Sequence, residues 1–281
     1  MGMAKLMSLG NRVNIDFPEA VRYFMEQDEA TKVIALYIEG IDEPKRLFKT
    51  IDSIKNKKPV IAYKAGKSEK GDAASRFHTG SLAGNYMIWK GALRQTNILE
   101  VNSVEELIDT AKVLDLCPFM KGNRVAVLSS QAGPGMIAAD ALEMSGMVLS
   151  KFSSQTQENI DKLLPPFAIR TNPVDMGPAW YSPETILNIL KIVAHDENTD
   201  GIIFIAIFAS ANLNLTKHME NIIEGMEEFK KPVIACLNAP LGIWDEEIKN
   251  LDGKKGIAII HTPERAARAM ANLWEISRLK D

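Results

Sequence analysis

The sequence contains 281 residues, of which 46% are hydrophobic and 25% are charged. This composition is typical of a soluble globular protein with room for two domains, and the net charge of -3 favours neither nucleic acid nor a membrane surface as a partner. Two cysteines, Cys117 and Cys236, offer no disulfide framework or metal-ligand spacing and fit a reduced cytoplasm. No apolar run reaches the roughly 18 residues of a membrane helix, and the first residues lack the apolar core of a signal peptide.

The first 116 residues alternate between predicted strands and helices. Residues 32–38 form a continuous apolar run of the kind that is buried on both faces of a parallel sheet. Asp16 and Pro18 suit the start of a helix, and residues 103–106 read as a capping box that opens another. We expect strands at residues 4–9, 32–38, 59–63 and 98–101, and helices at residues 17–27, 44–54, 86–93 and 103–114.

An unusually long connection follows the strand at residues 59–63. Connections between a strand and a helix typically take about 2–6 residues, whereas this one continues to residue 86. It is rich in Gly, Ser, Ala and Lys, and we predict a loop whose backbone N–H groups can bind an anion. His78 stands near its end, between Phe77 and Thr79. A histidine in such a loop can act as a nucleophile and carry a phosphoryl group, whereas a lone histidine is more often an ordinary loop residue.

The alternation restarts after residues 117–122, which we predict to be a linker. The segment KKPVIAYKAG of the first half resembles KKPVIACLNAP of the second, so we expect the two strands to be equivalent. The sequence therefore predicts an α/β protein with two related parallel sheets in tandem. In the second half we expect strands at residues 125–129, 148–152, 201–208, 232–237 and 257–260, and helices at residues 134–145, 156–164, 183–194, 217–229 and 263–279.

Three groups stand where a parallel sheet can place a ligand. Glu39 directly follows the strand at residues 32–38, at its carboxyl end, although a solvated carboxylate is the simpler alternative. Residues 130–135, SQAGPG, form a Gly-rich turn before a helix whose N-terminus attracts phosphate, although such a turn is more often only a tight turn. Residues 172–175, NPVD, lie in a proline-bounded loop, where an Asx–Pro turn is the simpler interpretation.

The residues around His78 are similar to those of one family. The segment AGKSEKGDAASRFHTGSLAG resembles the phosphohistidine loop of the NDP-forming acyl-CoA synthetases, a superfamily that includes the ADP-forming acetyl-CoA synthetases and succinyl-CoA synthetase. This sequence has Phe77 where the family usually has Ser. The segments VIALYIEG, RVAVLSSQAGPGMIAADALEMSG and NPVD resemble three further family motifs. Where the family usually has two glycines in the second of these, this sequence has Gln131–Ala132 or Ala132–Gly133, depending on the register.

This resemblance implies two tandem flavodoxin-like (succinyl-CoA synthetase-like) parallel-sheet domains at residues 1–116 and 123–281, the first without its opening strand–helix unit. It implies a ligase that interconverts acyl-CoA, NDP and phosphate with acid, CoA and NTP through a phosphohistidine. His78 and Glu39 would be the catalytic residues, with no metal site in the chain. The implied phosphate-binding residues are Thr79, Gly80, Gln131, Ala132, Gly133 and Gly135; the implied loop supports are Gly66, Gly71 and Gly84; and the implied second-domain motif residues are Asn172 and Asp175.

The resemblance also implies partner modules. An ATP-grasp subunit or domain would hold ATP/ADP or GTP/GDP with Mg²⁺, and a separate CoA-binding domain would hold CoA. Because neither module is present in the sequence, we expect the chain alone to be inactive, and we expect an oligomer in the cytoplasm without nucleic-acid or membrane partners. Two alternatives remain: a catalytically degenerate regulatory or assembly module of the same fold, and a flavodoxin-like binding protein for another anion.

Overall fold

The computed structural model describes residues 2–41, 43–54, 58–79, 86–93, 95–208 and 229–280, and for residues 75–79 it describes the backbone alone. The chain forms two compact units, an N-terminal unit of residues 2–111 and a C-terminal unit of residues 112–281. The division falls inside helix α5 (Val104–Leu116), ahead of the predicted linker. Cys117 and Met120 of that segment are buried, and the N–H of Met120 donates to Ser277 Oγ at 3.0 Å. Residues 117–122 therefore pack as part of the C-terminal unit.

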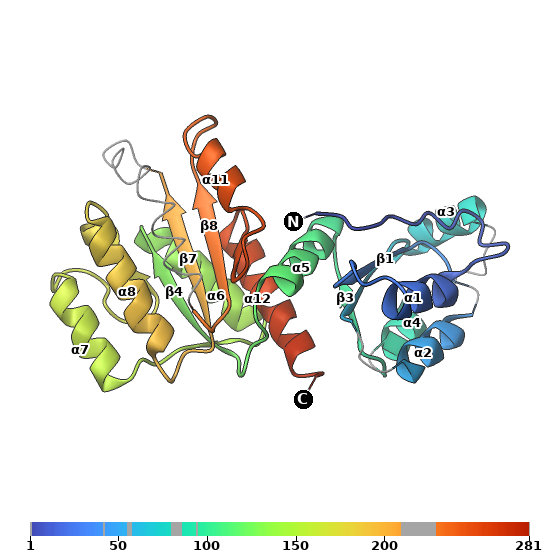
Figure 1. Cartoon of the computed structure of the whole chain (residues 1–281), viewed down its shortest axis with the longest axis horizontal. Helices are drawn as coiled ribbons and strands as arrows, with labels where there is room; N and C mark the ends of the chain where they lie inside the picture. The colour runs from blue at the N-terminus through green and yellow to red at the C-terminus, as the bar shows by residue number, and fades with distance from the viewer. Residues whose placement is uncertain are drawn as a thin grey trace. The chain divides into compact units, whose positions relative to one another are not determined.

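The N-terminal unit is a three-stranded parallel sheet with helices packed against it (Figure 1). The strand order is β1-β2-β3. Alternate residues of these strands form one buried cluster with apolar residues of α1, α2 and α4. The burial on both faces that was expected for residues 32–38 is wrong for β1, because Ala35 and Tyr37 on its other face are exposed. The elements are α1 (Phe17–Glu26), β1 (Ile34–Ile38), α2 (Pro44–Ser53), β2 (Val60–Lys64), α3 (Glu69–Thr79), α4 (Tyr86–Leu93) and β3 (Ile98–Val101).

The strand expected at residues 4–9 is wrong. Leu6 is 81% exposed, and this segment has no sheet partner within the described ranges. An isolated extended segment gains neither ladder hydrogen bonds nor burial. Lys5 instead donates to the Tyr23 hydroxyl at 2.9 Å and forms an ion pair with Asp28 at 3.0 Å, which attaches the segment to α1 and the turn after it.

The loop predicted after β2 is wrong for residues 69–79, which form helix α3. Ser68 Oγ accepts a hydrogen bond from the N–H of Gly71 at 3.2 Å, as an N-cap side chain does. Acidic residues in the first turn and the alanine pair that follows also favour a helix. Residues 80–85, which include Gly80 and Gly84, lie outside the described residues.

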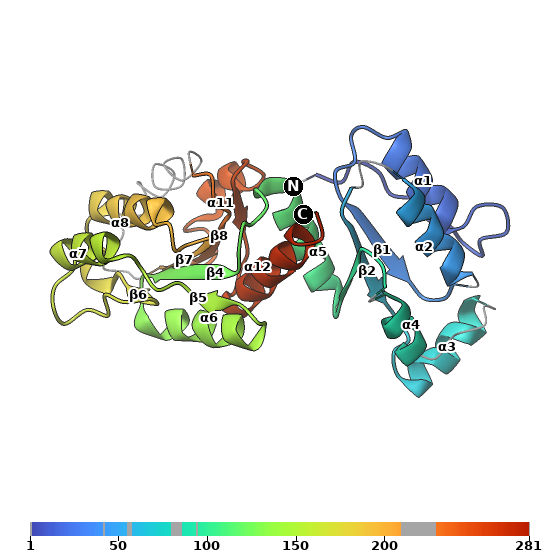
Figure 2. The ribbon, with the colours of Figure 1, turned by 90° about the horizontal axis from the view of Figure 1, so that it is seen from below.

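The C-terminal unit is a six-stranded parallel sheet between two layers of helices (Figures 1 and 2). The strand order is β5-β4-β7-β8-β9, and β6 pairs with β4. Helices α6 and α12 pack together on one face, while α7 and α8 pack together on the other and contribute to the main core cluster. The elements are β4 (Arg124–Ser129), α6 (Ala132–Met144), β5 (Val148–Leu149), α7 (Ser154–Leu163), β6 (Val174–Asp175), the 3-10 helix η1 (Gly177–Ala179), α8 (Pro183–His195), β7 (Gly201–Ile207), β8 (Val233–Asn238), α11 (Asp245–Leu251), β9 (Ile257–Ile259) and α12 (Pro263–Ser277).

The predicted α/β pattern of this unit is confirmed, with shifts at the ends of its elements. Helix α6 begins at Ala132 rather than at Pro134, so it takes up most of the turn predicted at residues 130–135. Helix α11 and the short strand β6 were not predicted from the sequence. The described ranges omit residues 209–228, and with them nearly all of the helix expected at residues 217–229. No helix in the described part of the chain has the length and apolar character needed to cross a bilayer.

The predicted equivalence of β2 and β8 is confirmed by their places in the two sheets. Each is the middle of three parallel strands, β1-β2-β3 in one unit and β7-β8-β9 in the other. Across the first sheet Ile34 pairs with Val60 and Val60 with Ile98. Across the second, Ile202, Val233 and Ile257 pair in the same way. The segment KKPVIA occupies the same positions at the start of both middle strands. Residues of β1, β2 and β3 therefore have counterparts at fixed positions of β7, β8 and β9.

Candidate functional site

The carboxyl edge of the β1-β2-β3 sheet gathers Glu39, one of the two catalytic residues predicted from the sequence, and several charged neighbours. Glu39 directly follows β1 and is half-buried. Helix α3 follows β2 after a short connection, and His78 belongs to the last turn of α3. Parallel strands end at one edge, and open α/β sheets bind ligands there. The sequence therefore placed Glu39 at the edge from which the histidine-bearing segment starts.

The connection between β2 and α3 explains two of the predicted glycines. Gly66 has φ of +74°, a left-handed conformation that favours glycine. A Cβ on Gly71 would lie 3.1 Å from Ser68 Oγ and 3.2 Å from the Gly66 Cα, closer than most Cβ contacts. The chain therefore turns tightly from β2 into α3, and the role of both glycines in supporting the histidine segment stays a prediction.

Lys64 is a member of this edge that the sequence reasoning missed. It is the last residue of β2 and is only 5% exposed. Its ammonium donates to the backbone oxygen of Glu39 at 2.6 Å and to the backbone oxygen of Ala65. Burial lowers the pKa of Lys64, while the carboxylates of Asp72, Glu39 and Glu100 act in the opposite direction. A charged residue at the end of an otherwise apolar strand was the sequence feature that could have indicated it.

Lys67 joins the same edge to β3 and α4. Its ammonium lies 3.3 Å from Glu100 Oε1 of β3. It also lies over the Tyr63 ring at 5.6 Å and the Tyr86 ring at 5.3 Å, within the range of cation–π attraction. Burial and the nearby Glu100 carboxylate raise the pKa of Tyr86. Because Tyr86 opens α4, Lys67 connects the residues that precede the histidine segment with those that follow it.

In the C-terminal unit, the predicted phosphate-binding residues lie at the start of α6. Gln131 is the N-cap residue but its side chain makes no capping hydrogen bond. Ser129 Oγ donates to the Gln131 backbone oxygen at 2.6 Å, which shapes the turn. A Cβ on Gly135 would lie 3.2 Å from the Ser129 Cβ, whereas a Cβ on Gly133 would meet nothing within 4 Å. The arrangement is a helix N-terminus of the kind that attracts anions, and it includes Gln131, Ala132, Gly133 and Gly135.

The two residues of the NPVD motif have different places. The Asn172 side chain donates to the Val125 and Ser150 backbone oxygens at 2.8 and 3.1 Å, and its oxygen accepts from the Val127 N–H at 2.9 Å. Asn172 therefore holds β4 and the segment after β5 together. Asp175 pairs with Ser129 across β6 and β4 and accepts from the Gly177 N–H at 2.9 Å, so it lies at the carboxyl edge beside the turn into α6.

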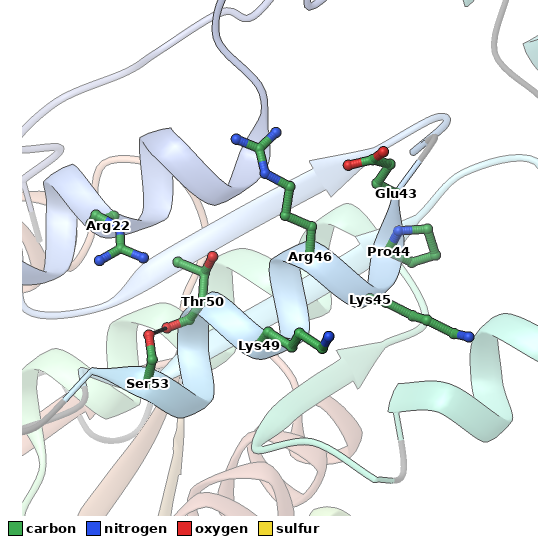
Figure 3. Close-up of a pocket in the computed structure, with 8 residues that line it drawn as sticks. All are labelled: Arg22, Glu43, Pro44, Lys45, Arg46, Lys49, Thr50 and Ser53. Atoms are coloured by element: carbon green, nitrogen blue, oxygen red, sulfur yellow. Dashed lines mark hydrogen bonds between the residues drawn. The ribbon is translucent and has the colours of Figure 1, made fainter.

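A separate open groove runs along α2 (Figure 3). It has a volume of about 880 Å³, and none of the predicted site residues lines it. Two of its cations have acidic partners, since Arg46 pairs with Glu19 and Arg22 lies 3.7 Å from Glu26. This groove is therefore a surface feature apart from the candidate site. Its lining residues are Arg22, Glu43, Pro44, Lys45, Arg46, Lys49, Thr50 and Ser53.

Comparisons with known proteins identify a matching family model and similar proteins. Residues 1–114 match the family described as succinyl-CoA ligase like flavodoxin domain. The chain is 38% identical to the alpha subunit of ADP-forming acetate–CoA ligase II of Pyrococcus furiosus, over 96% of this chain and 58% of that subunit. It is 33% identical to ADP-forming acetate–CoA ligase I of Archaeoglobus fulgidus, over 99% of this chain and 39% of that protein.

A solved structure shares the fold over nearly the whole chain. It is the dinucleotide forming acetyl-coenzyme A synthetase 1 of Ca. Korarchaeum cryptofilum in complex with phosphate and ADP, with a TM-score of 0.85 and 29% identity over 97% of this chain and 58% of that one. Residues 1–114 thus define a succinyl-CoA ligase-like flavodoxin domain, and the fold of the whole chain is that of part of this synthetase. More narrowly, the chain belongs to the NDP-forming acyl-CoA synthetase family, and it is similar to part of the ADP-forming acetate–CoA ligases named above. It spans about half the length of these relatives.

Proposed function

We propose that this chain carries the phosphoryl group in an NDP-forming acid–CoA ligase, with His78 as the carrier. The observation that supports this most directly is the carboxyl edge of β1-β2-β3, where half-buried Glu39 and buried Lys64 meet the connection into the histidine-bearing helix α3. The relatives named above are ADP-forming acetate–CoA ligases, and the phosphohistidine mechanism is our inference from the resemblance of the segment around His78 to the phosphohistidine loop of this family.

The proposed chemistry proceeds in three transfers. Phosphate displaces CoA from acyl-CoA and gives an acyl phosphate. A ring nitrogen of His78 then attacks phosphorus: the N–P bond forms as the P–O bond to the acyl group breaks, and the carboxylate leaves with the electron pair. Finally, a terminal oxygen of NDP attacks the phosphohistidine and gives NTP. The Glu39 carboxylate favours the cationic form of the imidazole and so steadies the N-phosphoryl adduct.

Other modules supply the remaining ligands in this proposal. A CoA-binding domain holds CoA, and an ATP-grasp module holds ATP/ADP or GTP/GDP with Mg²⁺. In this chain, the N–H groups at the start of α6, with Gln131, Ala132, Gly133 and Gly135, are suited to hold phosphate, because a helix N-terminus stabilises negative charge. Thr79 and Gly80 follow His78 directly and are proposed to bind the phosphoryl group that His78 carries.

The test is direct labelling of the purified chain with radiolabelled acetyl phosphate, followed by mapping of the label. We expect an acid-labile, base-stable label on His78 and none on His78→Ala. His195→Ala is the matched control, since His195 is exposed at the end of α8 and its Nδ1 donates to the Lys191 backbone oxygen at 2.7 Å. Label on another residue, or equal label on His78→Ala, would favour the catalytically degenerate module.

A further inference from the structure

The two sheets of this chain differ chemically at one edge. By the shared register, Glu39 corresponds to Ile207, Lys64 to Leu237 and Glu100 to Ile259. Each of these three charged residues thus has an aliphatic counterpart in the C-terminal sheet. Leu237 and Ile259 are 2% and 3% exposed, so this fold accommodates buried apolar side chains at these positions.

Burying charge has a free-energy cost that apolar residues avoid. Lys64 is nearly as buried as Leu237, at 5% exposure, and desolvation lowers its pKa. Because the same cross-strand register forms in the C-terminal unit with a leucine at this position, the register itself does not require Lys64. An explanation must come from what the ammonium contacts.

The Lys64 ammonium makes its hydrogen bonds at the point where the pairing of β1 with β2 ends. The ladder between β1 and β2 ends at the pair of Ile38 and Lys64, with the N–H of Ala65 donating to the Ile38 oxygen at 2.9 Å. In the C-terminal sheet the corresponding ladder continues by one more pair, Ile207 with Asn238. In the N-terminal sheet that next pair would be Glu39 with Ala65, and these are the two residues whose backbone oxygens accept from Lys64. The lysine therefore satisfies the two strand ends at the point where their pairing stops.

We propose that Lys64 is a positioning residue that fixes the backbone of Glu39 beside the histidine segment. This inference rests on the proposed function. It adds to that function a residue, Lys64, that acts through Glu39 rather than directly on the phosphoryl group. By holding the Glu39 peptide, Lys64 sets the direction in which the carboxylate leaves β1. A small displacement of such a group can lower a rate by about 10²-fold.

The experiment replaces Lys64 with leucine, the residue found at the corresponding position, Leu237, of the C-terminal sheet. Lys64→Leu is labelled with acetyl phosphate, and we expect the rate of His78 labelling to fall by about 10²-fold with retained cooperative unfolding. Lys58→Leu is the matched control, since the Lys58 ammonium also donates to two backbone oxygens, those of Phe24 at 2.7 Å and Asp28, away from this edge. It is expected to label at the wild-type rate. If Lys64→Leu does not fold, Lys64→Met, which keeps the unbranched chain, takes its place.

A double-mutant cycle separates positioning from a general structural effect. If Lys64 acts through Glu39, the variant with both Lys64→Leu and Glu39→Gln labels about as slowly as Glu39→Gln alone. Losses that multiply, or a Lys64→Leu chain that labels at the wild-type rate, would overturn this inference and leave the proposed function intact. A wild-type chain that takes no label on His78 would overturn the proposed function and this inference with it.

Discussion

At the scale of single residues, the Glu39 carboxylate has a role that can be separated from folding. Glu39→Gln keeps the size of the side chain and removes its charge, so the cationic imidazole loses its stabilising partner. We expect labelling of His78 to fall by about 10²–10⁴-fold, the range of one general acid–base or orienting group. Labelling rates of wild type and variant, together with their thermal unfolding midpoints, check this. Equal rates would remove Glu39 from the mechanism.

Asp200 provides a test of acid stability in the C-terminal unit. Its carboxylate accepts from Arg124 Nε at 2.8 Å and from the Arg124 backbone N–H at 3.1 Å. Burial alone would raise the pKa of Asp200, but these hydrogen bonds with Arg124 outweigh it and lower the pKa. A lowered pKa in the folded state stabilises the protein above the unfolded-state pKa of about 3.9, and that contribution is lost as pH falls through the folded-state pKa.

We therefore expect Asp200→Asn to lower the free energy of unfolding by about 2 kcal/mol at pH 7, the size of a hydrogen bond to a charged group. The difference between wild type and variant should shrink as the pH falls below about 4. Urea unfolding at a series of pH values measures it. A difference that stays constant down to strongly acidic pH would show that the Asp200 charge does not contribute in this way.

At the scale of elements, helix α6 contains two glycines, Gly133 and Gly135, that were both predicted to bind phosphate. Their surroundings in the structure differ. A Cβ on Gly135 would press on the Ser129 Cβ at 3.2 Å, while the position at Gly133 is open. We expect Gly135→Ala to destabilise the C-terminal unit by about 1–3 kcal/mol through overpacking. Gly133→Ala should stabilise it by about 0.4–1 kcal/mol, because alanine restricts the unfolded chain.

Chemical denaturation of the two alanine variants measures both effects. The pair is internally controlled, because the same substitution is made twice within the first turn of one helix. If both variants were stabilised to the same extent, the close approach of α6 to the end of β4 would not constrain Gly135.

The same elements show what sequence reasoning could reach at the site. Glu39 was predictable because it directly follows a strand whose apolar run is long enough to recognise. Helix α3 was missed because its glycine and serine content indicates a loop, and Ser68 becomes an N-cap only when the chain turns at Gly66. Lys64 was missed because lysines are mostly exposed, and the two carbonyl groups that receive its ammonium come from residues that only the paired strands bring together.

At the scale of the whole molecule, the chain spans 58% of the Pyrococcus subunit and 39% of the Archaeoglobus ligase. We predict that the purified chain forms no acyl-CoA from acid, CoA and ATP, because the modules proposed to hold CoA and nucleotide lie outside this sequence. Addition of a separate ATP-grasp protein and a CoA-binding domain of this family should restore turnover. A coupled assay for CoA consumption measures it, and turnover by the rigorously purified chain alone would contradict the proposed division of labour.

The overall α/β architecture was predictable because parallel sheets use long apolar strands, which stand out between amphipathic helices. The segment at residues 4–9 was the exception, since Leu6 and its neighbours are apolar without a sheet to enter. Short elements such as β6 and α11 were also missed, because tertiary contacts rather than periodicity define them. Pattern therefore predicts the strands of a core better than the segments that cover or extend it.

The matching registers of the two sheets also bear on the origin of the chain. Two sheets with the same three-strand order, the same cross-strand pairs and a shared KKPVIA segment are the expected remains of a duplicated ancestral half. After a duplication, only one copy must keep its reactive groups, and the other is free to accumulate substitutions that improve its stability. Leu237 shows that this position of the fold accommodates a buried aliphatic side chain, and Lys64 belongs to the copy to which we assign the phosphoryl chemistry.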